Sequence, residues 1–231
     1  MKAILLAAGL GTRLRPITDT VPKCLVPIKG RPLLDIWLQN LTEAGIGSFL
    51  INTYYLADKV EAYIRTSKYK NKVTLVYEPE LLGTAGTLRA NYQFFDGEDG
   101  MLIHADNYCL CDFKAFLQAH EQRDAKCLMT LMSFSTNTPE SCGIIEVDEN
   151  NIVTGFYEKV ARPPGNLANG AVYIISNKVI ELMIEKKYDD FSIQVIPNLL
   201  GKILNYENRD IHIDIGTPAT YNQAQNIKTH L

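Results

Sequence analysis

The sequence has few of the features that mark membrane, secreted or nucleic-acid-binding proteins. Its 231 residues carry a formal net charge of −3, which offers no excess of positive charge for DNA or RNA. The apolar stretch at residues 3–8 follows a single lysine and is too short for a signal peptide or a membrane span. No other segment reaches spanning length. We therefore expect a cytoplasmic protein without nucleic-acid or membrane partners.

Cysteine is sparse and lacks the spacing of a metal or redox site. Cys109 and Cys111 are two positions apart, whereas a zinc or dithiol motif has two residues between its cysteines. In a reducing cytoplasm we expect the five cysteines to be packing residues. Internal repeats, low-complexity tracts and linkers are also absent, so we predict a single domain over residues 1–231.

Apolar runs alternate with amphipathic stretches in the first half of the chain. We expect strands at residues 3–8, 48–54, 73–78 and 101–104, and helices at residues 33–44, 56–66, 85–95 and 112–121. This alternation is typical of an α/β fold with a Rossmann-like, mostly parallel sheet flanked by helices. Such sheets bind ligands beyond the carboxyl ends of their strands, which is where Gly9, Gly11 and Asp106 lie in the sequence.

The pattern changes after residue 125. Strands expected at residues 127–133, 142–147 and 152–158 follow one another without helices, and the Asp- and Asn-rich segment at 147–152 predicts a hairpin turn. A strand at 170–175, a helix at 177–185 and a strand at 211–215 follow. The second half therefore predicts a small antiparallel extension to the parallel core.

The first strand runs directly into the segment GLGTR, residues 9–13. Glycine leaves backbone N–H groups bare, so that a phosphate can approach them closely. Arg13 and Arg15 would add charge-assisted hydrogen bonds. The segment therefore predicts a polyphosphate site, and a glycine-rich turn without a ligand is the alternative.

A local basic cluster surrounds this segment and suits an anionic small ligand; its members are Arg13, Arg15, Lys23, Lys29 and Arg31. Two common phosphate-binding patterns are incomplete. The Rossmann pattern GxGxxG has Leu14 in place of its third glycine, and the Walker A pattern fails because Gly201-Lys202 lacks a partner glycine. The site must therefore be of another kind.

The wider segment LLAAGLGTRLRPITDTVPKCLVPIKGRPLL resembles the N-terminal signature of the sugar-1-phosphate nucleotidyltransferases. A strand, a GxGTR loop, Pro22-Lys23 and Pro32-Leu33 follow in the family's order and spacing. The resemblance extends to about Tyr221 through EPELLGTAG (78–86), LIHADN (102–107), the segment 142–159, NGAVY (169–173) and DIGTP (214–218). It implies a GT-A-like fold and transfer of a nucleotidyl group from an NTP to a sugar 1-phosphate, with release of pyrophosphate.

The resemblance also implies roles for the matching positions. Arg13 and Lys23 would be catalytic, and Asp106 and Asp214 would hold Mg²⁺. The nucleotide would lie against Leu6, Ala8, Gly9, Gly11, Thr12, Arg13, Glu78, Gly83 and Thr84. The sugar phosphate would lie against Asn107, Gly143, Glu158, Lys159 and Asn169. Ala105 stands where the family usually has glycine, and we expect its methyl group to reshape the sugar pocket. Because the chain ends soon after DIGTP, we expect no second domain.

Glu78 bears on the choice of base. A carboxylate only accepts hydrogen bonds, and guanine presents two adjacent donors, whereas thymidylyl and some uridylyl relatives usually have glutamine here. We therefore predict GTP as the nucleotide and mannose or heptose 1-phosphate as the acceptor, serving lipopolysaccharide or capsule biosynthesis. A homodimer is the one assembly that we consider.

Two alternatives stay open. One is a cytidylyl- or uridylyltransferase acting on glucose 1-phosphate or phosphocholine. Phosphocholine would need an aromatic box, for which the sequence offers Tyr54, Tyr55, Tyr157 and Tyr173. The other is a catalytically silent nucleotide-sugar sensor, but such a protein would be expected to lose Lys23 or one of the metal aspartates, and this chain keeps them.

Overall fold

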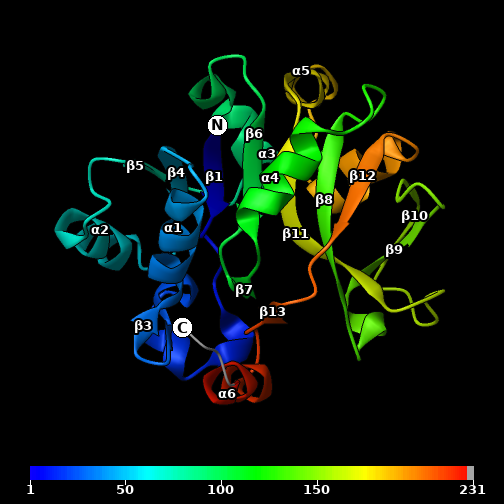
Figure 1. The fold of residues 1–231 in the computed structure, drawn as a ribbon. Coiled ribbons are helices and arrows are strands. Elements are labelled where there is room, and N and C mark those ends of the chain that lie inside the picture. The colour runs from blue at the N-terminus through cyan, green and yellow to red at the C-terminus, as the bar shows by residue number, and fades with distance from the viewer. Residues whose placement is uncertain (228–231) are drawn as a thin grey trace. The chain divides into compact units, whose positions relative to one another are not determined.

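The computed structural model describes residues 1–227, and their contacts form two compact units (Figure 1). Unit 1 contains residues 1–4, 82–103 and 111–210. Unit 2 contains residues 5–81, 104–110 and the chain from Ile211 onward. The chain passes between the units within β1 (Lys2–Leu6) and within β6 (Gly100–His104). In the described part of the chain, no helix is long and apolar enough to cross a membrane.

Unit 2 has the strand-and-helix alternation predicted for the first half. β4 (Ser48–Thr53) and β5 (Val73–Tyr77) pair in parallel, and α2 (Ala57–Thr66) connects them. α1 (Leu33–Glu43) precedes β4 and buries an apolar stripe that includes Trp37. Two short antiparallel pairs complete the unit: β2 (Pro27–Ile28) with β3 (Arg31–Pro32), and β7 (Asn107–Leu110) with β13 (Ile211–Asp214). α6 (Pro218–Asn226) follows β13.

Unit 1 holds the predicted antiparallel extension. β9 (Gly143–Val147) and β10 (Val153–Glu158) form a hairpin. β11 (Leu167–Ile175) pairs antiparallel with β6, β9 and β8 (Met129–Ser135), and β8 pairs in parallel with β12 (Ile203–Glu207). The helices are α3 (Thr84–Ala90), α4 (Phe113–Glu121) and α5 (Asn177–Lys186). Together with unit 2, these pairings confirm the mixed α/β fold class.

Several elements differ from the sequence-based expectations. The helix expected at 85–95 ends at Ala90, and a 3₁₀ turn follows at Tyr92–Phe95. Asn91 separates them, because its side chain donates to the Thr87 carbonyl at 2.8 Å and such local bonds compete with helix formation. β11 begins at Leu167 rather than at residue 170, and its pairing with β8 shifts register between Asn169 and Tyr173. β2, β3, β7, β12 and α6 were not predicted.

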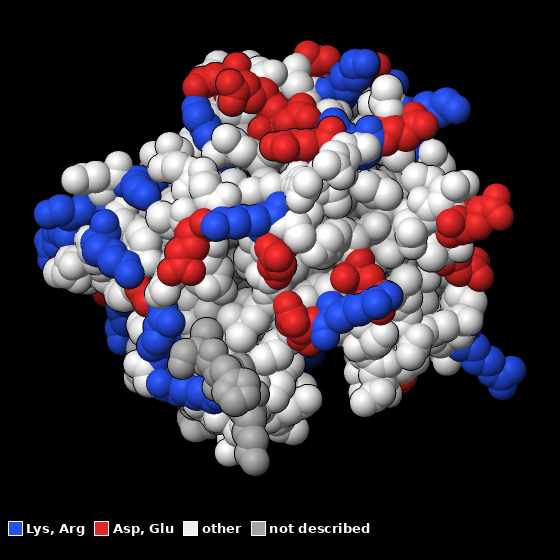
Figure 2. All heavy atoms as spheres, in the orientation of Figure 1, with Lys and Arg blue, Asp and Glu red and all other residues white. Residues whose placement is uncertain are grey.

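The basic cluster near the N-terminus is largely ion-paired within unit 2. Arg15 pairs with Asp19 at 3.1 Å, and Arg31 pairs with Asp35 at 2.7 Å. An anionic ligand therefore meets less free positive charge here than the sequence alone indicates. On the face drawn in Figure 2, basic side chains also gather at the left edge, over α2.

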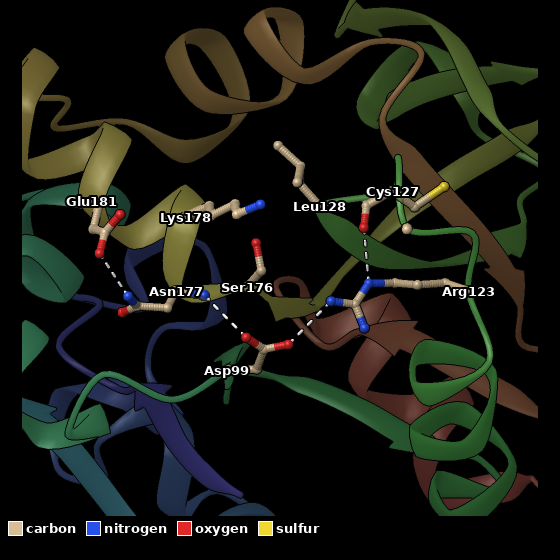
Figure 3. Close-up of a pocket in the computed structure, with 9 residues that line it drawn as sticks. Asp99, Arg123, Cys127, Leu128, Ser176, Asn177, Lys178 and Glu181 are labelled. Carbon is tan, nitrogen blue, oxygen red and sulfur yellow. Dashed lines mark hydrogen bonds and ion pairs between the residues drawn. The ribbon is translucent and has the colours of Figure 1, made fainter.

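A polar network lies at the start of α5 in unit 1. Asp99 accepts hydrogen bonds from the Asn177 amide and from Arg123 Nη2, both at 3.1 Å, and it lies 3.2 Å from His120 Nε2. His120 Nδ1 is 2.8 Å from Thr130 Oγ1. Figure 3 shows Asp99 between Asn177 and Arg123 in the wall of a hollow of about 550 Å³. The residues that line this hollow include none of the predicted site residues.

This network predicts how stability depends on pH. Burial, and then Arg123, lowers the pKa of His120 to about 4. Between about pH 6.5 and about pH 4 the unfolded chain binds a proton that the folded chain excludes, so stability falls as the pH drops through this window. Urea denaturation of His120→Gln should show a shallower loss across this window than the wild type. A residual slope is expected from His212, whose pKa is also lowered to about 4. Equal slopes would contradict the assignment.

Candidate active site

Lys23 is buried between two carboxylates of unit 2. Its Nζ donates to Asp106 Oδ2 at 2.7 Å and to Asp214 Oδ1 at 3.0 Å, and its side chain is only 7% exposed. A buried ammonium group needs such partners because desolvation penalises its charge. Burial opposes the charge on Lys23, but Asp106 and then Asp214 hold its pKa above the usual value. The three groups therefore form one charged cluster.

Strand pairing brings the two aspartates together. Asp106 lies in the turn between β6 and β7, and Asp214 is the last residue of β13. β7 and β13 are antiparallel with Asp214 opposite Asn107, so the two carboxylates come from adjacent strand ends. The Ala105 amide donates to the Leu6 carbonyl at 3.1 Å, which ties this turn to the end of β1.

Charge also accumulates around Asp214 and Asp106. Desolvation opposes the ionisation of Asp106, but Lys23 and then His104 hold the pKa of its carboxyl below the usual value. Arg13 Nη2 lies 3.3 Å from Asp214 Oδ2. A Cβ at Gly216 would lie 2.7 Å from the same Arg13 nitrogen and 2.9 Å from Asp214 Oδ1. The glycine of the DIGTP segment therefore leaves room for this ion pair.

The loop after β1 is held from one side and open on the other. Gly11 has a φ of 63°, and a Cβ there would lie 2.9 Å from Thr18 Cγ2. Thr18 is fully buried and donates to the Gly11 carbonyl at 2.7 Å. A Cβ at Gly9, in contrast, would meet no atom within 4 Å. Thr12 continues the loop as the first residue of a 3₁₀ turn. The loop thus has a fixed backbone with an exposed face at Gly9.

The carboxylates of Asp106 and Asp214 suit a hard divalent cation. Within residues 1–227, the structure contains no group of three or more His, Cys, Asp and Glu side chains that could hold a metal. Mg²⁺, however, takes one or two carboxylates and completes its shell with water and phosphate oxygens. The two side chains converge on Lys23 Nζ and are 36% and 53% exposed. This donor set therefore fits a metal ion that shares its shell with a nucleotide.

Glu78 is buried in unit 2. It follows β5 and is 2% exposed. Its Oε1 accepts from Asn52 Nδ2 at 3.0 Å, while Asn52 Oδ1 accepts from the Ala7 amide at 2.7 Å. Neither Asn52 nor Thr18 is among the site residues predicted from the sequence. A polar residue inside the apolar strand FLINT was the available signal for Asn52, because buried amides need partners.

Gly83 and Thr84 lie at the start of α3 in unit 1. Gly83 has a φ of 80°, and its Cα faces the Asp189 carbonyl so closely that no side chain fits. That carbonyl accepts from the Ala85 amide at 3.0 Å, and Thr84 Oγ1 accepts from the Phe191 amide at 2.8 Å. Both residues therefore have partners within the protein, and their contact with a nucleotide stays a prediction.

Gly143, Glu158 and Lys159 come together at one end of the β9–β10 hairpin in unit 1. Gly143 is the cross-strand partner of Glu158, and a Cβ at Gly143 would lie 2.6 Å from Glu158 Oε2. Glycine thus makes room for the carboxylate. Lys159 Nζ pairs with Glu158 Oε1 at 3.1 Å and is exposed. This ammonium group is available to an anion.

Asn169 is more constrained than the sequence indicates. Its Nδ2 donates to Tyr173 Oη at 2.7 Å, and its Oδ1 accepts from the Ala171 amide at 3.0 Å. Tyr173 is fully buried and stacks on Phe191 with ring centroids 4.4 Å apart. Tyr173 is therefore closed to a quaternary ammonium group. In unit 2, the carbonyl of Asn107 accepts from Trp37 Nε1 at 2.9 Å.

Comparison with known proteins identifies relatives over nearly the whole chain. A mannose-1-phosphate guanyltransferase of Candida glabrata is 29% identical over 96% of this chain and 63% of its own length. The chain thus spans less than two thirds of the first relatives that it matches. A D-glycero-alpha-D-manno-heptose 1-phosphate guanylyltransferase of Campylobacter jejuni is 27% identical over 96% of this chain and 97% of its own length.

The matches also include another nucleotide specificity and a solved structure. A UTP–glucose-1-phosphate uridylyltransferase of Synechocystis is 27% identical over 97% of this chain and 62% of its own length. HddC from Yersinia pseudotuberculosis, solved in complex with GMP-PN, superposes with a TM-score of 0.80 at 26% identity over 97% of both chains. The sequence profile described as nucleotidyl transferase matches residues 2–230, and the chain belongs to that family.

Proposed function

We propose that this chain transfers a guanylyl group from GTP to mannose or heptose 1-phosphate and releases pyrophosphate. The observation that carries the proposal is Lys23, buried between Asp106 and Asp214 in the same unit as the open glycine loop. The names of the mannose and heptose relatives support guanylyl transfer and the choice of acceptors.

The proposed reaction is an in-line displacement. A phosphate oxygen of the acceptor forms a bond to the α-phosphorus, the bond from that phosphorus to the β-phosphate oxygen breaks, and pyrophosphate leaves. Catalysis of such a step depends on positioning and on neutralisation of phosphate charge. Amides of the loop at Gly9 and Gly11 would bind the phosphates, Arg13 would hold the pyrophosphate, and Lys23 would offset charge at the α-phosphate.

The remaining predicted residues complete this assignment. Asp106 and Asp214 would hold Mg²⁺, which when bound supplies further charge neutralisation to the phosphates. The exposed Lys159 ammonium would pair with the acceptor's phosphate, and Glu158 would accept hydrogen bonds from its hydroxyl groups. Leu6, Ala8, Thr12, Gly83 and Thr84 are proposed for the nucleotide, and Asn107, Gly143 and Asn169 for the sugar phosphate.

Pyrophosphate release tests the proposal. The purified chain should be assayed with Mg²⁺ and each of GTP, CTP, UTP, ATP and dTTP against mannose, glucose and heptose 1-phosphates and phosphocholine. We expect release with GTP and mannose or heptose 1-phosphate, and its loss when EDTA removes the metal. Release with another base alone would keep the family activity and reject guanylyl transfer. A folded chain that binds a nucleotide but releases nothing would be the silent sensor.

A uridylyltransferase is the second candidate. The Synechocystis relative favours it, and so does the burial of Glu78, since a base cannot reach a carboxylate that is 2% exposed unless the side chain turns. The same assay separates the two, because a uridylyltransferase would prefer UTP with glucose 1-phosphate.

Lys23 provides the first prediction from the site. Lys23→Met leaves two neighbouring carboxylates without their shared cation, and we expect kcat/KM to fall by about 10²-fold or more. Lys186→Met is the control, because Lys186 is an exposed lysine that pairs with Glu185 at 2.9 Å. Circular dichroism should confirm that both variants are folded. Equal activity of the two variants would remove Lys23 from the mechanism.

Glu78 provides the second. If its carboxylate reads guanine, Glu78→Gln should lower the ratio of kcat/KM for GTP to that for UTP by about tenfold, because an amide places a donor against a guanine donor. Glu80→Gln is the matched control, since it removes the same charge at an exposed position two residues away. An unchanged ratio in Glu78→Gln would show that another group selects the base.

A further inference from the structure

Asn52 joins two segments of unit 2 that are proposed to bind the nucleotide. Ala7 is the first residue after β1 and leads into the glycine loop. Its amide donates to Asn52 Oδ1 at 2.7 Å. On the other side, Asn52 Nδ2 donates to Glu78 Oε1 at 3.0 Å. One side chain on β4 therefore bridges the start of the phosphate loop and the residue proposed to select the base.

The chemistry of the side chain matches these two neighbours. A backbone amide needs an acceptor and an ionised carboxylate needs a donor, and the asparagine amide supplies one of each. The reversed amide would place a donor against the Ala7 N–H and an oxygen against the Glu78 carboxylate. Asn52 is 3% exposed and Glu78 is 2% exposed, so water cannot readily replace either bond. Loss of a buried bond of this kind is costly.

We infer that Asn52 is a positioning residue for nucleotide binding. Its amide holds the Ala7 amide and the Glu78 carboxylate in one register, and so fixes the start of the phosphate loop relative to the base-selecting segment. Glu78 also donates its own backbone amide to the Thr53 carbonyl at 2.9 Å, so β4 controls both the main chain and the side chain of Glu78. This inference rests on the proposed function, since the benefit of the register is binding of a nucleoside triphosphate.

A charge-swap series tests the inference. Asn52→Asp keeps an acceptor for the Ala7 amide but removes the donor to Glu78 and places two carboxylates in contact. The double variant Asn52→Asp with Glu78→Gln reverses the polarity of the bond and restores it. Glu78→Gln alone is the reference for the double variant. Asn205→Asp is the matched control, because Asn205 is another buried strand asparagine, 8% exposed, and lies on β12 in unit 1.

Two readouts separate positioning from simple stabilisation. The first is hydrogen–deuterium exchange, followed by mass spectrometry, in peptides that cover residues 7–14. The second is KM and kcat for GTP. For Asn52→Asp we expect exchange in this loop to rise by about tenfold and the KM for GTP to rise by a similar factor. The double variant should return both to the values of Glu78→Gln alone, and Asn205→Asp should change neither.

The outcomes are distinct. If Asn52→Asp lowers the melting temperature as Asn205→Asp does but leaves loop exchange and KM unchanged, Asn52 is only a packing residue and the inference is wrong. Failure of the double variant to restore loop protection would also overturn it. If the wild type releases no pyrophosphate with any substrate pair, the proposed function fails, and the exchange data alone then confirm or overturn the role of Asn52 in holding the loop.

Discussion

A lysine ammonium group held out of water by two carboxylates constrains the rest of unit 2. Removal of either Asp106 or Asp214 would leave buried charge without full compensation, which is among the more costly changes in a folded protein. The three residues come from the 3₁₀ turn after Pro22, from the β6–β7 turn and from the end of β13. Three distant segments must therefore meet within hydrogen-bonding distance, and the register of β7 against β13 ensures that they do.

The same cluster combines stability with the proposed chemistry. The carboxylates that neutralise Lys23 are also the groups proposed to hold a metal ion, so two cations would share one pair of anions. Arg13 adds a third positive group at Asp214. Such a cluster can redistribute its hydrogen bonds when phosphate charge arrives, because each cation has alternative anionic partners. The glycine loop, held beneath by Thr18 and open at Gly9, provides the surface on which that charge would lie.

The sequence was informative where the determining signal was local. Hydrophobic periodicity located β1, β4, β5, α1 and α2 to within a few residues, and the GLGTR segment located the loop that follows β1. The pairing of β7 with β13 was not predictable in this way, because it depends on residues about a hundred positions apart that have no shared periodicity.

Side-chain environment was the second limit. Glu78 was predicted from its chemical type, but type alone does not show that its carboxylate is buried against Asn52. The two internal hydrogen bonds of Asn169 were missed for the same reason, since they depend on the left-handed backbone at Ala171 and on the buried Tyr173. Residue identity predicts which chemistry is available, and only the packing shows which groups are already in use.

The separation of the charged cluster along the chain has a consequence for biosynthesis. Lys23 and Asp214 are 191 positions apart, whereas Lys23 and Asp106 are 83 apart. During translation, Lys23 emerges from the ribosome long before its second counter-ion is made. The early segment of unit 2 must therefore keep this lysine hydrated, or paired with Asp106 alone, until β13 is synthesised and can pair with β7. Final closure of this unit is thus a late event in folding, and a nascent chain that stalls before β13 would present an incompletely neutralised lysine to chaperones.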